Sequence, residues 1–272
     1  MTRDAIVIGS GQGGNPVSYA LAEHGWTVAF VEKSHLAGTC INTGCTPTKT
    51  MIAAAQVAHF ARNAAQWGVR TGRIEVDLSF VVDRKNAVVK RFRGNQERNV
   101  AWHPSLRLFR GHIRFLSSRQ VQVDDEVFES DRIFIDTGTR PHPPNIAGLD
   151  SINYPTNESL MEIRGVPEHL LILGGGYFGL EFGQMVRRFG SSVTIVPRGP
   201  QMLQGEDADS ASELEKALEN EGVEFRLNSN PIWVEKREGK IALTIAAGGR
   251  NETITGSHLL TAAGRQPRAE YR

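Results

Sequence analysis

The sequence predicts an α/β fold made of two similar units, each with a strand, a glycine-rich loop, a helix and a second strand in that order. An apolar run at 5–8 precedes a glycine-rich loop at 9–14, and the same pattern returns at 170–173 and 174–179. A repeated pattern of this kind sets the architecture before any local assignment is made. The length of 272 residues also suits two domains of roughly 150 residues each.

The first unit continues from its loop into a helix over 15–24 and a strand over 27–31. An alanine-rich segment and a charged segment then predict two helices, over 48–67 and about 79–99. Short alternating runs after them predict strands of a small sheet, at 107–115, 120–123 and 132–135.

Prolines and glycine cluster at 137–144, which is typical of a linker. We therefore expect one domain over 1–142 with a stub at 263–272, and a second domain over 143–262. Helical patterns in the second domain cover 180–189 and 209–221. Apolar runs predict its strands, at 170–173, 192–196, 223–227, 232–236, 241–245 and 259–261.

The overall charge excludes some functions. Lys and Arg number 31 against 30 Asp and Glu, a net charge of +1, so we expect no nucleic-acid partner.

No apolar run approaches the roughly 20 residues of a membrane span, and the start of the chain leaves no room for a signal peptide. We expect a cytoplasmic protein with no membrane partner, and we interpret the basic run at 84–98 as a solvent-facing helix side.

The first glycine loop has a definite physical meaning. Its glycines, Gly9, Gly11, Gly13 and Gly14, allow a tight turn, a close approach to a pyrophosphate and close packing of helix on strand. Glu32 follows Gly9 by roughly 20 residues, where a carboxylate accepts hydrogen bonds from a ribose. These features indicate a Rossmann-like site for a dinucleotide without a 2′-phosphate. The alternative is a glycine-rich turn with a surface glutamate.

The second loop carries Gly174, Gly176 and Gly179, but Pro197 stands where its ribose-binding acid would be. Arg198 follows, and an arginine suits a 2′-phosphate through charge-assisted hydrogen bonds. The second nucleotide is therefore predicted to be NADPH, with NADH disfavoured. The alternative is a solvated surface arginine.

Two cysteines, Cys40 and Cys45, lie in the string Gly38-Thr39-Cys40-Ile41-Asn42-Thr43-Gly44-Cys45-Thr46-Pro47-Thr48-Lys49. In a reducing compartment such a close pair suggests redox chemistry more than a structural staple. Two buried free cysteines, or half of a zinc site, are the alternatives. The histidines show no metal-binding spacing, so we expect no metal site.

The motifs taken in order resemble one known family over essentially the whole chain. They are the loops 9–14 and 174–181, the cysteine string, Thr137-Gly138-Thr139-Arg140-Pro141 and Ala263-Gly264-Arg265. Together they resemble the class I pyridine nucleotide-disulfide oxidoreductases, the group of glutathione reductase, dihydrolipoamide dehydrogenase and mercuric reductase. The residues of the first loop and of the cysteine string favour the mercuric-reductase-like branch. The resemblance implies FAD in the first domain and NAD(P)H in the second.

Roles for individual residues follow from this resemblance. It implies a redox-active Cys40–Cys45 disulfide, in which Cys45 is nearer the flavin and Cys40 attacks the substrate. Gly44 and Pro47 are compatible with such a bond and place Cys45 near a helix N-terminus, which lowers a thiolate's pKa. Lys49 resembles a lysine beside the flavin's reactive nitrogen, Glu181 its ion-pair partner and Tyr177 an aromatic gate over the flavin. The implied cofactor-binding residues are Gly9, Gly11, Gly13, Gly14, Glu32, Gly38, Thr39, Thr137, Gly138, Gly174, Gly176, Gly179, Arg198, Gly264 and Arg265.

The implied function is electron transfer from NAD(P)H through FAD to the cysteine pair, and on to a small-molecule disulfide or a metal ion. In this homodimeric family a returning FAD segment and a dimerisation domain follow the Gly-Arg motif, whereas only 266–272 follow Arg265 here. We expect an FAD domain that is incomplete at its C-terminus, no dimerisation domain, and no disulfide reductase turnover by this chain alone. Asp136 also stands where the family has a small apolar residue, and a buried carboxylate there would be costly. The alternatives are a non-catalytic nucleotide-binding or redox-sensing protein, and an NAD(P)H oxidase that bypasses the disulfide.

Overall fold

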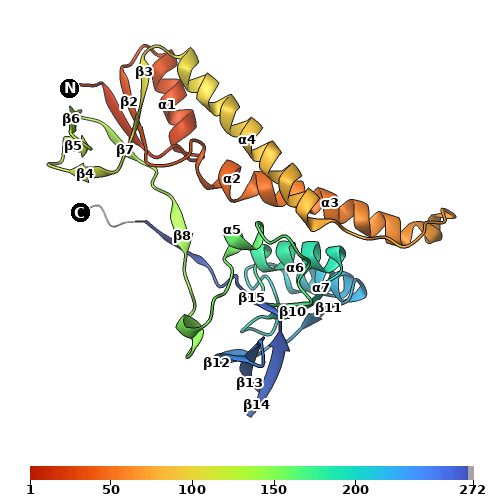
Figure 1. Ribbon diagram of the computed structural model, residues 1–272. Coiled ribbons are helices and arrows are strands. Elements are labelled where there is room, and N and C mark those ends of the chain that lie inside the picture. Colours follow the sequence, from red (N-terminus) through yellow and green to blue (C-terminus); the bar gives the residue numbers. More distant parts are fainter. Residues whose placement is uncertain (269–272) are drawn as a thin grey trace. The chain divides into compact units, whose positions relative to one another are not determined.

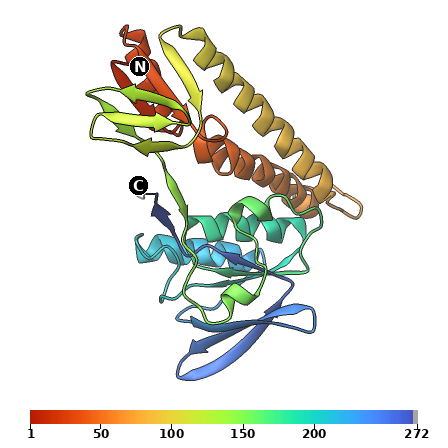
Figure 2. The same cartoon turned by 60° about the vertical axis from the view of Figure 1, so that its left-hand side comes forward.

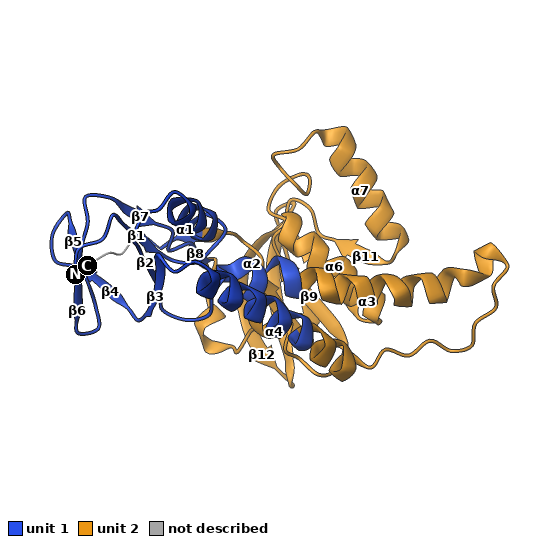
Figure 3. Cartoon of the chain, turned by 90° about the horizontal axis from the view of Figure 1, so that it is seen from above, with its two compact units in different colours: residues 1–47, 86–140, 266–272 blue, residues 48–85, 141–265 orange. Residues whose placement is uncertain are grey.

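The computed structural model describes residues 1–268 and divides the chain into two compact units (Figures 1 and 3). Among the described residues, unit 1 comprises 1–47, 86–140 and 266–268, and unit 2 comprises 48–85 and 141–265. The chain enters unit 2 near the start of helix α3 (Cys45–Asn63) and leaves it within helix α4 (Leu78–Trp102).

Unit 1 is built on a four-stranded parallel sheet in the order β3-β2-β1-β7. The strands are β1 (Ala5–Ile8), β2 (Val28–Glu32), β3 (Leu106–Arg110) and β7 (Ile133–Ile135). Because side chains alternate along a strand, Val7 and Phe30 face one cluster, with Val100 of α4 and residues of helix α1 (Gly14–Glu23). Ile6 and Val31 face the other.

The second face of this sheet is covered by a small antiparallel sheet, β4 (Ile113–Phe115), β5 (Gln120–Val123) and β6 (Glu126–Glu129). Val121, Val123 and Phe128 supply its apolar contacts. The expectation that all the alternating runs after 106 form one small sheet is wrong. β3 and β7 join the parallel sheet instead, because each pairs with a buried central strand and extends the same two-sided core.

Unit 2 repeats this plan with the parallel sheet β11-β10-β9-β15. The strands are β9 (His169–Leu173), β10 (Ser192–Val196), β11 (Val223–Phe225) and β15 (His258–Thr261). Ile172 and Ile195 face helix α6 (Tyr177–Phe189), and α7 (Ala208–Asn220) adds Leu218 to the same cluster. On the other face Leu171 packs with an antiparallel sheet, β12 (Asn230–Arg237), β13 (Lys240–Ala247) and β14 (Arg250–Gly256).

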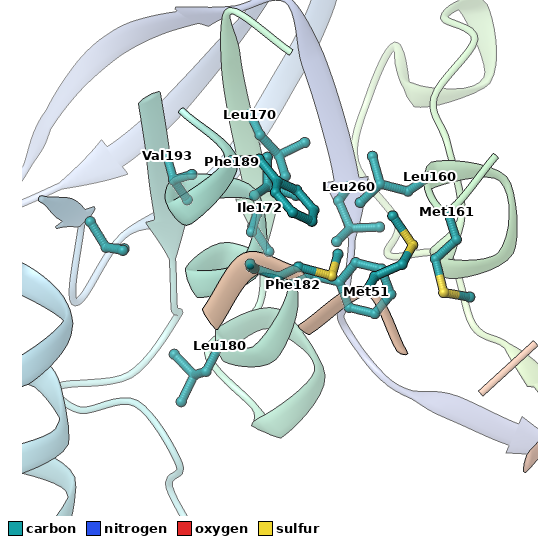
Figure 4. Packing of buried hydrophobic residues seen from close by; sticks show 14 of the residues in the cluster. Met51, Leu160, Met161, Leu170, Ile172, Leu180, Phe182, Phe189, Val193 and Leu260 are labelled. Atoms are coloured by element: carbon teal, nitrogen blue, oxygen red, sulfur yellow. The ribbon is translucent and has the colours of Figure 1, made fainter. Parts of the chain in front are cut away.

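The first helices after the cysteine string belong to the core of unit 2. Met51 and Ala55 of α3 and Val82 of α4 are buried in one cluster with Phe182 of α6. Figure 4 shows Met51 beside the Phe182 ring. Residues 48–85 therefore belong to unit 2, whereas the sequence predicted them in the first domain. The limits of the two nucleotide-binding domains remain a prediction.

Lys85 shows why a basic run does not define a solvated face. Its side chain is 2% exposed and pairs with Glu162, which is 56% exposed. Arg84, Lys90 and Arg91 of the same run are exposed as expected. At the helical period of 3.6 residues, Lys85 falls on the buried side of α4, with Val82 and Val89. The expectation of a solvent-facing run is wrong at this position.

The remaining elements are short. They are α2 (Gly38–Asn42), the 3-10 turns η1 (Ala64–Trp67) and η2 (Leu149–Ser151), α5 (Asn157–Leu160), and the paired strands β8 (Thr139–Pro141) and β16 (Arg265–Pro267). In the part of the chain that the structure describes, no helix has both the length and the apolar character of a membrane span. Figure 2 shows helices and sheets in both units, and each unit has one sheet of parallel strands. This confirms the predicted α/β class.

Candidate functional site

The glycine loop of unit 1 (residues 9–14) joins β1 to α1 in a conformation that side chains would prevent. Gly9 has φ +95°, in the left-handed region that favours glycine. A Cβ on Gly14 would lie 1.9 Å from the carbonyl oxygen of Gly9, and a Cβ on Gly38 would lie 2.7 Å from Cα of Gly11. The loop, the start of α1 and the first residue of α2 are therefore brought together at the carboxyl edge of the sheet.

Glu32 ends β2 at this same edge and is buried. One carboxylate oxygen, Oε2, accepts hydrogen bonds from the Ser10 N–H (3.1 Å) and Ser10 Oγ (2.7 Å). The other, Oε1, accepts bonds from the Ser34 N–H (2.9 Å) and Ser34 Oγ (3.3 Å). A carboxylate has about four acceptor positions, so the two serines use all of them. The sequence interpretation gave neither serine a role, although Ser10 lies between Gly9 and Gly11 and Ser34 is two residues after Glu32.

Asp136 follows β7 and lies beside the glycine loop. Its Oδ2 accepts a hydrogen bond from the Gly14 N–H at 2.7 Å. That N–H belongs to the first turn of α1, where a phosphate would bind in a dinucleotide site. The loop and Glu32 lie where the pyrophosphate and the ribose of a dinucleotide would bind, and the Gly14 N–H at that place is bonded to Asp136.

The cysteines lie on either side of a tight turn between α2 and α3. Cys40 is in α2 and half-buried, whereas Cys45 begins α3 and is exposed; both are free thiols. The turn requires a glycine, because a Cβ on Gly44 would lie 2.9 Å from the carbonyl oxygen of Thr39.

The two thiols interact. Burial, and then a hydrogen bond to the Cys45 thiol, raise the pKa of Cys40 from 9.0 to about 11. This contact is compatible with the predicted disulfide, which stays a prediction. Among residues 1–268, no three His, Cys, Asp or Glu side chains gather as a metal site would require.

Lys49 and Glu181 form an ion pair between α3 and α6. Their side chains are 60% and 39% exposed, so the pair faces solvent. Tyr177, the first residue of α6, is exposed, and its hydroxyl donates a hydrogen bond to Glu206. This bond raises the pKa of Tyr177 above its usual value. The sequence interpretation named Lys49, Glu181 and Tyr177 but not Glu206.

Unit 2 has a cavity of about 410 Å³ at the carboxyl edge of its parallel sheet. Its walls include the second glycine loop, the exposed Arg198 after β10, and Gly264. Close packing again requires glycines, because Cβ atoms on Gly174 and Gly179 would lie 2.5 Å from the Ala262 oxygen and 2.3 Å from the Gly174 oxygen. The predicted residues Gly174, Gly176, Arg198 and Gly264 thus come together around one space that has the place and size of a ligand site.

Thr137 and Gly138 both contact the segment after β16. Thr137 Oγ1 donates to the Arg268 carbonyl oxygen at 2.9 Å, and the Arg268 N–H donates to the Gly138 oxygen at 2.9 Å. Arg265 is the first residue of β16. These contacts hold the two chain segments together, and cofactor binding by Thr137, Gly138 and Arg265 stays a prediction.

The chain is similar to known proteins of one family. Residues 3–272 match the family model described as pyridine nucleotide-disulphide oxidoreductase. The chain belongs to this family. Its members are oxidoreductases, which agrees with the resemblance seen in the motifs.

Relatives of several kinds match over nearly the whole chain. This chain is 34% identical over 271 residues to a dihydrolipoyl dehydrogenase of Thermus scotoductus. The match covers 99% of this chain and 58% of that protein. It is 32% identical over 264 residues to a mercuric reductase of Bacillus cereus, covering 97% of this chain and 42% of that protein. The chain thus spans about half the length of these family members.

The fold comparison agrees. The solved structure described as a Cu(II) complex of the HOCl-induced flavoprotein disulfide reductase RclA from Escherichia coli has a TM-score of 0.85 and 31% identity to this chain. The match covers all of this chain and 58% of that one. This family membership confirms the Rossmann-type α/β fold, and the family binds FAD and a pyridine nucleotide.

Proposed function

We propose that this chain serves in electron transfer from NADPH through FAD to the Cys40–Cys45 pair, and from there to a small-molecule disulfide or a metal ion. The observation that carries the proposal is the hydrogen-bonded contact between the two thiols across a glycine turn, which follows the glycine loop at 9–14, helix α1 and strand β2 in the chain. FAD, when bound, would supply the two-electron chemistry that links a nicotinamide to a pair of thiols.

Unit 1 supplies the groups that would hold FAD. The glycine loop and the N-terminus of α1 offer backbone N–H groups to a pyrophosphate. Glu32 offers its carboxylate oxygens as acceptors for the hydroxyls of the adenosine ribose. In this structure the same oxygens accept hydrogen bonds from the Ser10 and Ser34 hydroxyls. Because the two serines already use the acceptor positions of Glu32, a ribose diol would have to replace some of these serine donors.

Unit 2 supplies a site for NADPH. Its cavity runs from the glycine loop at Gly174 to Arg198 and Gly264. The guanidinium of Arg198 offers a planar set of donors that matches a phosphate. Pro197 precedes it at the end of β10, so no carboxylate there would bind the 2′-hydroxyl of NADH. We assign Tyr177 and the Lys49–Glu181 pair to the nicotinamide end of the reaction.

The cysteine pair would exchange two electrons and two protons with its substrate. When a disulfide substrate is reduced, its S–S bond breaks to give two thiols, while the thiols of Cys40 and Cys45 lose two protons and join in an S–S bond. Thiolates are also good ligands for soft metal ions. Mercuric reductases are among the relatives, which supports a metal ion as the other substrate class.

The test is an absorption spectrum of the FAD-loaded chain before and after addition of NADPH. The expected result is a long-wavelength band from a thiolate next to the flavin, which Cys45→Ser removes and Thr50→Ser leaves unchanged. Bleaching of the flavin without that band would instead support the disulfide-independent oxidase. A protein that stays colourless with added FAD would support the nucleotide-binding or redox-sensing alternative.

Thiol titration provides a second test, because the chain has only two cysteines. Under mild oxidation the number of reactive thiols should fall by two, and reduction should restore both. An unchanged titre would refute the proposed Cys40–Cys45 disulfide.

A further inference from the structure

The backbone fixes Asp136 beside the glycine loop of unit 1. β7 pairs with β1 so that Ile135 stands opposite Ile8, and the Asp136 N–H donates to the Ile8 carbonyl oxygen at 2.7 Å. A Cβ on Gly9 would lie 2.1 Å from the Asp136 carbonyl oxygen. Asp136 is therefore the first residue beyond the sheet edge, in contact with the start of the loop.

The carboxylate of Asp136 occupies the space that the missing glycine side chains leave. Cβ atoms built on Gly11 and Gly14 would lie 2.9 Å and 3.2 Å from its Oδ2, and one on Gly13 would lie 3.3 Å from its Oδ1. Its Oδ2 also accepts the Gly14 N–H bond. Helix α1 has no side-chain cap of its own and no acidic residue in its first turn. Asp136 thus provides the negative charge that stabilises this helix N-terminus.

Unit 2 contains the same arrangement with a different residue. The Ala262 N–H donates to the Leu173 carbonyl oxygen at 2.8 Å, directly after Thr261, which stands opposite Leu173. A Cβ on Gly174 would lie 2.5 Å from the Ala262 oxygen, as a Cβ on Gly9 would lie close to the Asp136 oxygen. Asp136 and Ala262 are therefore equivalent positions of the repeat. Where the residue is alanine, the loop borders the cavity described above.

We propose that Asp136 is an internal competitor for the pyrophosphate of FAD in unit 1. This inference rests on the proposed function, which places FAD on this loop. The carboxylate and a pyrophosphate require the same N–H donor, and two negative charges in one small space repel each other. FAD must displace Asp136 to bind, so the residue stabilises the flavin-free chain and weakens flavin binding. Asp136 is in this sense a determinant of cofactor affinity rather than a catalytic residue.

The experiment measures FAD affinity by flavin fluorescence for wild type, Asp136→Ala and Asp136→Asn. Asp136→Ala should bind FAD about tenfold more tightly or better, because it empties the loop and removes the charge. Asp136→Asn keeps an acceptor for Gly14 but loses the charge, so its gain should be smaller. Asp125→Asn removes a charge from an exposed position in the same unit and should leave the affinity unchanged.

A second readout separates competition from a purely structural role. Without FAD, Asp136→Ala should melt at a lower temperature than wild type, because α1 loses its capping charge. The combination of lower stability and tighter FAD binding is the expected signature. A variant that is less stable and binds FAD equally or more weakly would overturn the inference.

The reciprocal change tests the equivalence of the two units. Ala262→Asp should weaken NADPH binding by at least about tenfold, while Ala262→Asn, which matches it in size but is uncharged, should weaken it less. Equal effects of the two variants would count against a charge-based competition. If wild type binds FAD and Asp136→Ala binds it no better, only the inference fails. If neither protein binds FAD, the proposed function fails together with it.

Discussion

Lys49 and Glu181 join two helices of unit 2 at the surface, directly above an apolar core. Met51, two residues after Lys49, and Phe182, next to Glu181, lie in the same buried cluster. The core fixes the two helices, and the ion pair itself is largely exposed. Exposed pairs contribute about 0–1 kcal/mol to stability, so packing rather than this pair holds α3 on α6.

The first prediction follows from this difference. Lys49→Met and Glu181→Gln should each change the free energy of unfolding by less than about 1 kcal/mol in urea titration. Either change should slow the NADPH-dependent reduction of bound FAD by more than about tenfold, since we assign the pair to the nicotinamide end of the reaction. Lys216→Met, which breaks the exposed Lys216–Glu213 pair on α7, is the matched control and should affect neither quantity. A large loss of stability with an unchanged reduction rate would show that the pair is structural.

The second prediction concerns the reactivity of the two thiols. Burial and the Cys45 hydrogen bond raise the pKa of Cys40 to about 11. Raising a thiol's pKa lowers its thiolate fraction at a given pH, so Cys40 should alkylate slowly at pH 8 and faster as the pH approaches 11. Relative to the ordinary value of 9.0, its thiolate fraction at pH 8 is about a hundredfold smaller.

Iodoacetamide labelling followed by mass spectrometry of the reduced protein would measure this. Exposed Cys45 should be labelled first. Cys45→Ala should speed the labelling of Cys40, because it removes the hydrogen bond and the charge interaction through which the Cys45 side chain raises the pKa of Cys40, although burial, the largest cause, remains. Labelling of both cysteines at the same rate at pH 8 would contradict the prediction.

The third prediction is a preference for NADPH over NADH that depends on Arg198. Loss of a charge-assisted hydrogen bond costs about 1.5–3 kcal/mol, which is roughly a ten- to hundredfold loss of affinity. Arg198→Ala should weaken NADPH binding by this factor in calorimetric titration and leave NADH binding nearly unchanged. Arg250→Ala, on exposed strand β14, is the control. Equal affinities of wild type for the two nucleotides would reject the assignment.

The fourth prediction concerns Glu32. Its removal in Glu32→Ala leaves the N–H and hydroxyl of fully buried Ser10 without their acceptor. A buried donor without a partner costs about 1–3 kcal/mol, so the free energy of unfolding should fall by about that amount even without FAD. Glu126→Ala, at an exposed position of β6, should cost much less. A Glu32→Ala protein as stable as this control would show that the four hydrogen bonds contribute little.

Local sequence patterns were enough to predict both strand–loop–helix–strand units, because each is continuous in the chain and its apolar residues recur with the period of its own structure. Glu32 was predictable for the same reason, since the end of β2 lies at a regular distance from the loop. The helix that begins at Cys45 was indicated by Pro47, which is tolerated only in a first turn.

Other assignments depended on which distant segments become neighbours. An alternating run such as that of β3 has the same appearance in a small antiparallel sheet and at the edge of a larger parallel one, so only the pairing with β2 decided its place. The buried position of Lys85 required both the face of α4 and the partner Glu162.

The clearest division concerns Asp136 and Ala262. An aspartate before Thr137 and the repeat of two glycine loops can be seen in the sequence. The equivalence of Asp136 and Ala262 emerges only in the folded chain, because each follows the last strand to join its sheet and meets the loop from more than 80 residues away. Whether a carboxylate lies against a glycine loop depends on this long-range pairing of parallel strands, which no local period or spacing encodes.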